Sequence, residues 1–263
     1  MTDTGYGTRT LGVAQRRQVG AYTLLAVHDD APAPRPGQFA MLAAADGWGG
    51  GEDERPFLPR AVSVCAHEEG RVEYLLEAVG PGTELLCGLQ AGARLRALGP
   101  LGNGFSAPRE GEHAVLVGGG IGVAPLVLLE RRLSAATVLL GFRDAPRAAA
   151  AGLFTAPRVA TDDGSVGAHG SVLALLEPEL AAQGAKVYAC GPAAMLEAVR
   201  ALCDERSVAC ELALESPMAC GYGACWGCVV PLSDGSYARL CFDGPVIDAA
   251  RLDRVGEGFG AAS

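Results

Sequence analysis

The stretch VGGGIGVAPL at residues 117–126 places a glycine-rich turn between a strand-like run and a helix-like run. The apolar run HAVLVG leads into it at residues 113–118. Glycines in such a turn let the backbone approach a pyrophosphate, and the N-terminus of the following helix supplies N–H groups. Gly118, Gly120 and Gly122 do not form a strict G-x-G-x-x-G. The stretch therefore predicts a dinucleotide-binding turn, with a glycine-rich loop that binds nothing as the alternative.

The same alternation of strand and helix patterns continues to about residue 212 and predicts a parallel sheet. The carboxyl ends of strands in such a sheet line the ligand crevice. Gly191 and Pro192 make a sharp turn after one predicted strand, and Cys190 lies at its end or simply packs in the core. The stretch TDDGSVGAHG at residues 161–170 is as typical of a surface loop as of a functional turn. The strand-like runs are HAVLVG, TVLLGF, RVAT, KVYAC and VACEL, and the helix-like runs are APLVLLERRL, SVLALLEPELAAQG and PAAMLEAVRALCDE.

The first hundred residues have a different pattern. Short strand-like runs broken by Gly and Pro between residues 10 and about 107 predict a small antiparallel barrel or sandwich. The glycine-rich insert at residues 47–56 is expected to be an exposed loop. Arg60 and Ser63 lie on one predicted strand, and the turn GPGT follows at residues 80–83. A guanidinium and such a turn can each bind a phosphate, although an arginine on a strand is usually a solvated one.

Four of the nine cysteines are clustered near the C-terminus. Cys220, Cys225 and Cys228 follow the spacing C-x4-C-x2-C, and twelve residues separate the last of them from Cys241. This is the spacing of plant-type [2Fe–2S] proteins, and the small residues between the cysteines let backbone N–H groups point at the sulfurs. A structural zinc is the alternative, but zinc ribbons use two C-x2-C pairs and this chain has one. The remaining cysteines are expected to be small buried hydrophobes: Cys65, Cys87, Cys190, Cys203 and Cys210.

Composition restricts the class of protein. Of the 263 residues, 49% are hydrophobic and 19% are charged, which is typical of a globular chain with substantial cores. The formal charge of −9 argues against nucleic acid as the main partner. No apolar run has the length of a membrane span, and the first twenty residues carry no signal-peptide pattern. We therefore expect a cytoplasmic protein with no membrane partner, in which clustered cysteines indicate a metal rather than disulfides.

These motifs together resemble the electron-transfer subunits of two-component, NAD-linked dihydroorotate dehydrogenases, a family of the ferredoxin reductase-like flavoprotein superfamily. The order of the motifs along nearly the whole chain is more specific than any one of them. Two features depart from the family pattern: Ala61 stands where the family usually has proline, and the insert at residues 47–56 is unfamiliar. The shared stretches are PGQF, LPRAVSV, GPGTELL, GPLGNGF, VGGGIGVAPL, TDDGSVGAHG, YACGPAAML, MACGYGACWGC and CFDGPV.

The resemblance implies a fold that is α/β plus all-β. An antiparallel FAD-binding β-barrel would span residues 1–108, a Rossmann-like NAD-binding domain with a parallel sheet residues 109–212, and a [2Fe–2S] module residues 213–263. Arg60 would lie at the FAD phosphates and Ser63 near the flavin ring. By resemblance, FAD would be bound by Arg60, Ala61, Val62, Ser63, Leu75, Leu76, Glu77, Gly82 and Thr83, the nicotinamide nucleotide by Gly118, Gly119, Gly120, Gly122, Cys190, Gly191 and Pro192, and the cluster by Cys220, Cys225, Cys228 and Cys241.

The resemblance also implies an activity. FAD exchanges two electrons with NAD(H) and the cluster takes one at a time, so electron counting gives the order NAD(H), FAD, [2Fe–2S], partner. The implied partner is an FMN-containing dihydroorotate dehydrogenase catalytic subunit of pyrimidine biosynthesis, in a heterotetramer with two of each chain. This chain would then contain no orotate site. Trp226 and Tyr222 are expected either to anchor that interface or to shield the cluster from water.

Other functions stay open at this point. The small subunit of an NAD(P)H:ferredoxin oxidoreductase or of a sulfur-reducing hydrogenase complex would have the same three parts and a different partner. A zinc- or redox-sensing binding module would have lost its flavin, and the retained stretches PRAVS and GGGIG argue against it. The choice between NAD and NADP is also open, because Arg143, Asp144 and Arg147 follow the second strand of the nucleotide domain together.

Overall fold

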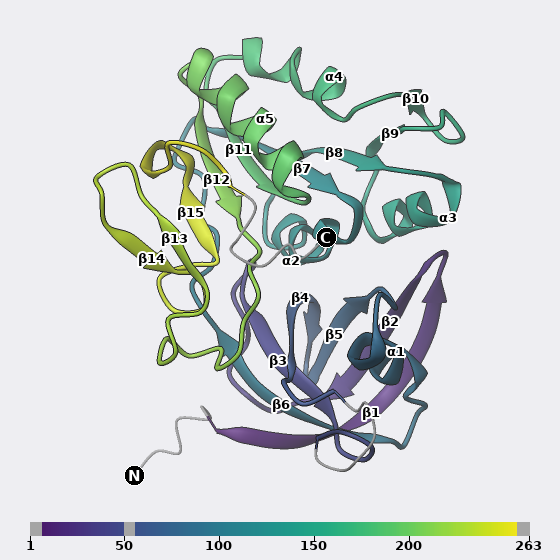
Figure 1. Cartoon of the computed structure of the whole chain (residues 1–263). Coiled ribbons are helices and arrows are strands. Elements are labelled where there is room, and N and C mark those ends of the chain that lie inside the picture. The colour runs from purple at the N-terminus through teal and green to yellow at the C-terminus, as the bar shows by residue number, and fades with distance from the viewer. Residues whose placement is uncertain (1–6, 50–55, 257–263) are drawn as a thin grey trace.

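The computed structural model describes residues 7–49 and 56–256, so the predicted exposed insert at residues 47–56 is described only at its two ends. Figure 1 shows three parts: a barrel in purple and blue, a sheet flanked by helices above it, and a smaller yellow-green module beside both. A closed antiparallel barrel joined to a largely parallel sheet confirms the predicted fold class.

Six antiparallel strands close the barrel in the order β1-β2-β5-β4-β3-β6. Leu25, Leu42 and Leu95 are completely buried in its core. Closure pairs every strand on both sides and leaves no free edge. A helix, α1, begins at Pro81 where the sequence pattern predicted only a turn, because proline is favoured in the first turn of a helix. The elements are β1 (Thr8–Val19), β2 (Tyr22–His28), β3 (Phe39–Ala44), β4 (Arg60–Glu68), β5 (Arg71–Leu76), α1 (Pro81–Gly88) and β6 (Arg94–Leu101).

The second part is a seven-stranded sheet in the order β10-β9-β8-β7-β11-β12-β15. All neighbouring pairs are parallel except β12 and β15. The chain enters at β7, extends outward through β8, β9 and β10, and then crosses over to β11, so the topological switch point lies between β7 and β11. The strands are β7 (His113–Gly119), β8 (Thr137–Phe142), β9 (Arg158–Thr161), β10 (Ala168–His169), β11 (Ala185–Cys190), β12 (Ala209–Ala213) and β15 (Val246–Asp248).

Short helices connect these strands. The predicted helix over residues 171–184 is divided in two, because Pro178 cannot continue the first helix with a backbone hydrogen bond. The two residues of β10 lie in the stretch TDDGSVGAHG, for which the sequence predicts only a loop or turn. The helices are η1 (Gly120–Val123), α2 (Ala124–Glu130), α3 (Ala145–Ala148), η2 (Ala149–Leu153), α4 (Leu173–Leu176), η3 (Glu179–Ala181), α5 (Ala193–Glu205) and η4 (Ala249–Arg251).

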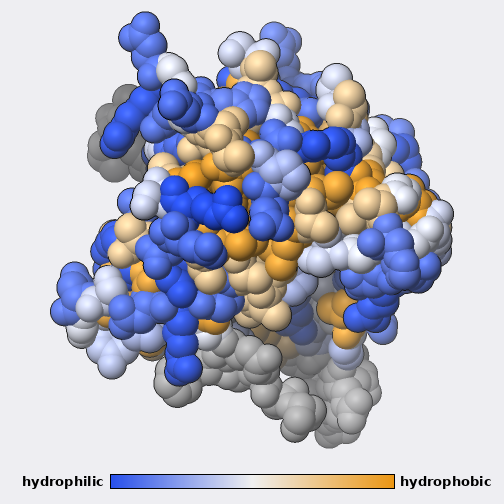
Figure 2. All heavy atoms as spheres, turned by 90° about the horizontal axis from the view of Figure 1, so that it is seen from above, coloured by the Kyte–Doolittle hydropathy of each residue, from blue (hydrophilic) through white to orange (hydrophobic). Residues whose placement is uncertain are grey.

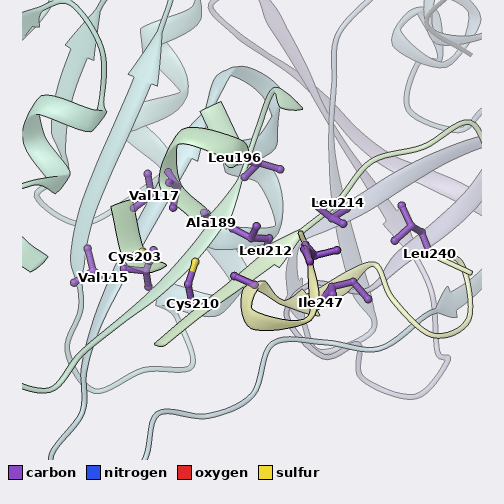
Figure 3. Packing of buried hydrophobic residues seen from close by; sticks show 14 of the residues in the cluster. Val115, Val117, Ala189, Leu196, Cys203, Cys210, Leu212, Leu214, Leu240 and Ile247 are labelled. Atoms are coloured by element: carbon purple, nitrogen blue, oxygen red, sulfur yellow. The ribbon is translucent and has the colours of Figure 1, made fainter. Parts of the chain in front are cut away.

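The cysteine-bearing segment shares its core with the sheet. It contains the hairpin β13 (Val229–Pro231) and β14 (Tyr237–Arg239) and ends by adding β15 to the sheet. Leu240 and Ile247 belong to the same hydrophobic cluster as Val117 and Leu212 of the sheet (Figure 3). The domain boundaries at residues 108 and 212 stay predictions, since a strand from the third predicted part completes the sheet of the second.

A polar cluster around the buried Lys186 anchors the segment between β6 and β7, which joins the barrel to the sheet. Lys186 Nζ donates to Ser106 Oγ at 2.6 Å and lies 3.1 Å from a carboxylate oxygen of Glu211. The same carboxylate accepts from the Ser106 amide at 2.9 Å and from its hydroxyl. The side chains of Lys186 and Glu211 are only 9% and 16% exposed. Each charge therefore depends on the other for its compensation.

Polar residues cover much of the molecular surface. In Figure 2, seen from above the sheet, hydrophilic residues lie around the periphery and apolar residues gather toward the centre of that face. Among the described residues, no helix is both long enough and apolar enough to traverse a bilayer.

Replacing Lys186 by methionine tests the anchoring cluster. We expect Lys186→Met to lower the free energy of unfolding by about 3 kcal/mol, because it leaves the Glu211 carboxylate buried without its cation. Urea denaturation at neutral pH measures the change. The matched control is Arg158→Met, which removes a 2.7 Å pair with Glu179 whose arginine is 47% exposed and is expected to cost less than about 1 kcal/mol. Equal losses in the two variants would contradict the assignment.

Candidate functional site

Two adjoining cavities lie between the barrel and the carboxyl ends of the sheet strands. The barrel cavity, of about 250 Å³, is lined mainly by β4, β5 and the segment after β12. The sheet cavity, of about 540 Å³, is lined mainly by the turns that follow the sheet strands. Both include Glu77, Val79, Ile121 and Glu215 in their walls. Ligands that fill the two cavities would therefore lie against each other.

Most residues predicted to bind FAD meet in the barrel cavity. They come together because β4 and β5 are antiparallel neighbours and α1 begins just after β5. The cavity also has apolar walls from residues to which the sequence motifs assigned no role, including Phe39, Leu214 and Met218. The predicted residues in its lining are Ala61, Val62, Ser63, Leu75, Leu76, Glu77 and Thr83.

Arg60 and Gly82, also predicted to bind FAD, lie together at the start of α1 outside that lining. A Cβ on Gly82 would come within 2.7 Å of Arg60 Cζ, so the missing side chain makes room for the guanidinium. Arg60 also stacks over the Trp48 ring with Cζ 5.6 Å from its centroid. The Thr83 hydroxyl is already engaged by the backbone of the same turn. A phosphate here would be met by the guanidinium and by N–H groups of the first helical turn.

The sheet cavity is built at the topological switch point. A Cβ on Gly122 would lie 2.6 Å from the Gly191 backbone, so the turns after β7 and β11 touch only because both lack side chains. The lining contains the predicted residues Gly119, Gly120, Gly122, Gly191 and Pro192. The sequence pattern did not single out Tyr22, Asp162 or Glu215, although the last two follow strand ends and the carboxyl-end rule could have found them.

Gly118 and Cys190, predicted on the nicotinamide side, do not line the cavity. A Cβ on Gly118 would lie 2.8 Å from a methyl of Val123, so this glycine permits β7 to pack against η1. Cys190 is buried in the core, and burial raises the pKa of its thiol well above the usual value. Both residues pack in the core next to the turn and outside the cavity lining. Their direct contact with a nucleotide remains a prediction.

Polar groups from the barrel and the sheet meet across the sheet cavity. Arg147 lies 3.0 Å from a Glu77 oxygen on the barrel side and 2.7 Å from Asp144 on its own side. The buried hydroxyl of Tyr22 has no hydrogen-bond partner within the described part of the chain. Burial, and then the Glu77 carboxylate, raise the pKa of Tyr22, so the hydroxyl stays protonated. This hydroxyl lies in the wall of the cavity, where a polar ligand would accept its hydrogen bond.

Glu215 lies where the two cavities meet, directly after β12. The residue is exposed to solvent where it lines the cavities, but the protein around its carboxyl partly desolvates the charged form and raises its pKa. A ligand that displaced the water would favour the protonated carboxyl further.

The four clustered cysteines form two pairs. Within residues 7–49 and 56–256, no three such groups converge on a point that would hold one metal ion. Cys228 and Cys241 are buried, with their sulfurs 3.2 Å apart. The side chain and amide of Cys225 both interact with the Cys220 sulfur nearer the surface. Two pairs of thiolates are the donor set of a [2Fe–2S] cluster, in which four cysteines serve two irons.

The backbone around these cysteines is arranged to receive negative charge. Burial opposes ionisation of Cys220, but amide groups of Cys225 and Tyr222 hydrogen bond its sulfur and lower its pKa to about 6. The Gly223 amide donates to Cys241 Sγ at 3.1 Å. Gly223 has a φ of 86°, a conformation that favours glycine, which is why this position lacks a side chain. The loop thus fits a thiolate-bound cluster.

Comparison with known proteins identifies the family. Residues 215–253 match the family model described as the iron-sulfur cluster binding domain of dihydroorotate dehydrogenase B. The electron transfer subunit of dihydroorotate dehydrogenase B (NAD(+)) from Geobacillus thermodenitrificans is 40% identical over 235 residues, which cover 82% of this chain and 86% of that protein. The subunit of the same name from Desulforamulus reducens is 37% identical over 225 residues, covering 80% and 84%. This chain belongs to the family of dihydroorotate dehydrogenase B electron transfer subunits. The resemblance inferred from the motifs is confirmed.

Solved structures of other proteins share the fold of this chain. A structure of an NADH-dependent reduced ferredoxin-NADP oxidoreductase superposes with a TM-score of 0.78 at 24% identity and covers 94% of this chain and 91% of its own. A ferredoxin NADP+ reductase from Neisseria gonorrhoeae, with bound FAD and NADP, has a TM-score of 0.61 at 17% identity and covers 76% and 91%. At these identities the likeness establishes the ferredoxin reductase-like fold alone.

Serine substitutions at the cysteines test the ligand set. We expect Cys220→Ser, Cys225→Ser, Cys228→Ser and Cys241→Ser each to remove most of the bound iron, because a [2Fe–2S] cluster needs all four thiolates. Iron and acid-labile sulfide analysis of anaerobically purified protein measures this. Cys203→Ser, in a buried core cysteine, is the control and should retain full iron. Zinc in place of iron in the unmutated protein would contradict the assignment.

Proposed function

We propose that this chain carries electrons between NAD(H) and a dihydroorotate dehydrogenase catalytic subunit of pyrimidine biosynthesis, through FAD and a [2Fe–2S] cluster. One observation carries the proposal. The sheet cavity adjoins the barrel cavity, and Met218, in the wall of the barrel cavity, is two residues from Cys220. FAD supplies hydride exchange with the nicotinamide, and the cluster supplies single-electron transfer. The chain supplies their order and spacing.

The barrel cavity has the chemistry needed to hold FAD. Its apolar wall from Val62, Leu75 and Leu76 suits an aromatic ring, and Ser63 adds a hydroxyl at the same strand. Arg60 and the first turn of α1 provide a cation and free N–H groups for the phosphates. These residues bind and orient the group and exclude water from one side of it.

The sheet cavity suits a nicotinamide nucleotide, and we propose that this nucleotide is NAD. The side-chain-free turns at Gly122 and Gly191 admit a pyrophosphate. Arg147 is already paired with two carboxylates, and the carboxylate of Asp162 lines the same cavity. Arg143 lines the same cavity as well, so the charges of its wall do not choose between NAD and NADP. The preference for NAD rests on the names of the relatives, which specify NAD(+).

Filling the glycine turn tests the nucleotide site. We expect Gly122→Val to keep its flavin absorbance but to lose about a hundredfold in the rate of flavin bleaching by NADH, because the added side chain collides with the Gly191 backbone. Anaerobic stopped-flow absorbance measures the rate, and NADPH should be slower than NADH with the unmutated protein. Gly152→Ala, where an added Cβ meets nothing within 4 Å, is the control. An unchanged rate in Gly122→Val would place the nucleotide elsewhere.

The partner implied by the family is a catalytic subunit, and we propose that it contains FMN, that it binds over the cysteine module, and that two of each chain assemble. Tyr222, Trp226, Tyr237 and Phe242 are each more than half exposed on this module. Exposed aromatic residues are enriched in protein interfaces, and Cys225 is exposed among them. A partner seated there would bring its own cofactor close to the cluster.

Truncating one aromatic residue tests this surface. We expect Tyr222→Ala to weaken binding of the co-expressed catalytic subunit by about 2 kcal/mol, roughly thirtyfold, as for a central interface aromatic. Size-exclusion chromatography with mass determination measures both binding and the ratio of chains. Val166→Ala, at an exposed residue of the sheet domain, is the control. Unchanged binding in Tyr222→Ala would exclude this surface, and a complex that reduces ferredoxin but does not oxidise dihydroorotate would exclude the proposed partner.

We further propose a cytoplasmic location. None of the nine cysteines forms a disulfide, as expected in a reducing compartment.

A further inference from the structure

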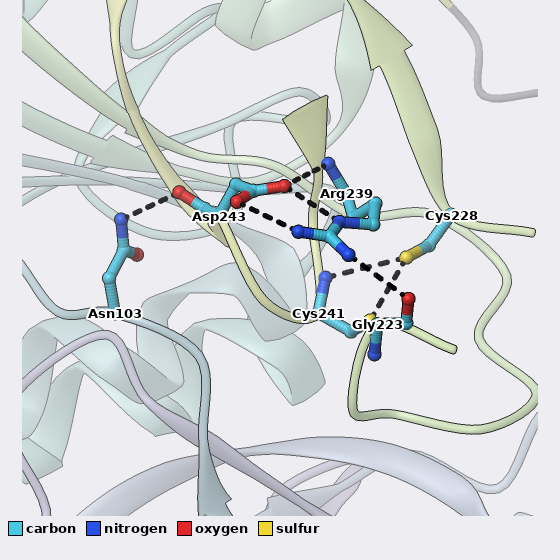
Figure 4. A network of polar contacts seen from close by, with 6 residues as sticks. All are labelled: Asn103, Gly223, Cys228, Arg239, Cys241 and Asp243. Atoms are coloured by element: carbon cyan, nitrogen blue, oxygen red, sulfur yellow. Dashed lines mark hydrogen bonds and ion pairs between the residues drawn. The ribbon is translucent and has the colours of Figure 1, made fainter. Parts of the chain in front are cut away.

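Arg239, at the end of β14, is held rigidly beside the cysteine loop (Figure 4). Its Nε lies 3.0 Å from Asp243 Oδ2, and its backbone amide donates to the same oxygen at 2.9 Å. On the other side, Nη1 donates to the Gly223 carbonyl at 3.2 Å. The guanidinium is therefore fixed between a carboxylate and the loop that carries the cluster ligands.

Two aromatic rings also pack on this guanidinium. Its Cζ lies 5.0 Å from the centroid of Trp226 and 4.6 Å from that of Phe242. Trp226 has a φ of 59°, a left-handed conformation that a residue with a side chain rarely adopts. Stacking by Arg239 stabilises this strained residue, which lies within the Cys225–Cys228 turn. Because the rings replace part of its hydration, the arginine side chain is only 24% exposed.

The fixed guanidinium lies next to the buried cysteine pair, Cys228 and Cys241. Gly223, which accepts from Arg239, donates its own amide to Cys241 Sγ at 3.1 Å. The Cys241 amide in turn lies 3.4 Å from Cys228 Sγ. In Figure 4 the guanidinium lies between the Asp243 carboxylate and these two sulfurs. The positive charge is thus the part of the ion pair that faces the cluster site.

We propose that Arg239 is a positioning residue that raises the reduction potential of the cluster. The inference rests on the proposed function in requiring a [2Fe–2S] cluster at the four cysteines. Reduction adds one negative charge to that cluster, and a nearby permanent cation favours the more negative state. Asp243 opposes this effect weakly, because it lies behind the guanidinium as seen from the sulfurs. Hydrogen bonds and charge near the sulfurs are known to set such potentials.

A redox titration of the cluster tests the proposal without measuring turnover. The complex is titrated anaerobically, and the electron paramagnetic resonance signal of the reduced cluster is followed for the unmutated chain, Arg239→Gln and Asp243→Asn. We expect Arg239→Gln to lower the reduced-to-oxidised ratio about tenfold at a given potential, equivalent to about 59 mV for one electron. Asp243→Asn should shift the midpoint in the opposite direction. Arg206→Gln, which removes an arginine charge at the end of α5, is the matched control and should leave the midpoint unchanged.

The outcomes separate this inference from the proposed function. An unmutated protein without a cluster would overturn both. A cluster that assembles in Arg239→Gln with the unmutated midpoint would overturn the inference alone. If Arg239→Gln takes up no iron, Asp243→Asn decides: an upward shift supports the role of the charge, and an unchanged or lower midpoint refutes it. A purely structural role for the ion pair does not produce shifts of opposite sign in the two variants.

Discussion

The cysteine loop can lie on the barrel because Gly221 has no side chain. A Cβ at this position would come within 2.5 Å of Met41 Cγ and 3.2 Å of Leu101 Cδ1, both on barrel strands. Gly221 also has a φ of 80°, so the loop turns here in a conformation that other residues rarely adopt. This close approach places Met218 in the wall of the barrel cavity and Cys220 just beyond it. The spacing between the barrel cavity and the cysteine loop depends on that contact.

The position of the sheet cavity beside the barrel cavity depends on how the barrel is held against the sheet. The amide of Ala21 in the β1–β2 turn donates to the Pro146 carbonyl at 2.9 Å, and Arg147 next to it reaches Glu77 on the barrel. The Lys186 cluster additionally holds the segment that connects the barrel to the sheet. These contacts keep the two cavities adjoining. Pre-organised distances of this kind are what a protein contributes when its cofactors perform the chemistry.

The features that the sequence predicts well are local in the chain. The glycine turn after β7 and the cysteine spacing are each set by residues close in sequence, and the strand-helix alternation is a short-range pattern. Features that depend on distant partners were not predictable in this way. Tyr22 and Glu215 face the cavities only because the barrel docks on the sheet, and β15 joins the sheet through a pairing with β12 that leaves no periodic signal. Gly118 shows the converse: a recognisable motif position whose role in the structure is packing.

The four clustered cysteines, the proposed cluster ligands, are divided between the core and the loop. Cys228 and Cys241 belong to the hydrophobic cluster that also contains the sheet, so core packing fixes their positions. Cys220 and Cys225 lie outside it and are positioned only by the glycine-rich loop, whose order depends on backbone hydrogen bonds to sulfur. Metal binding contributes folding free energy where ligands are not already fixed. Packing therefore fixes Cys228 and Cys241, whereas the loop alone positions Cys220 and Cys225 among the exposed aromatic residues.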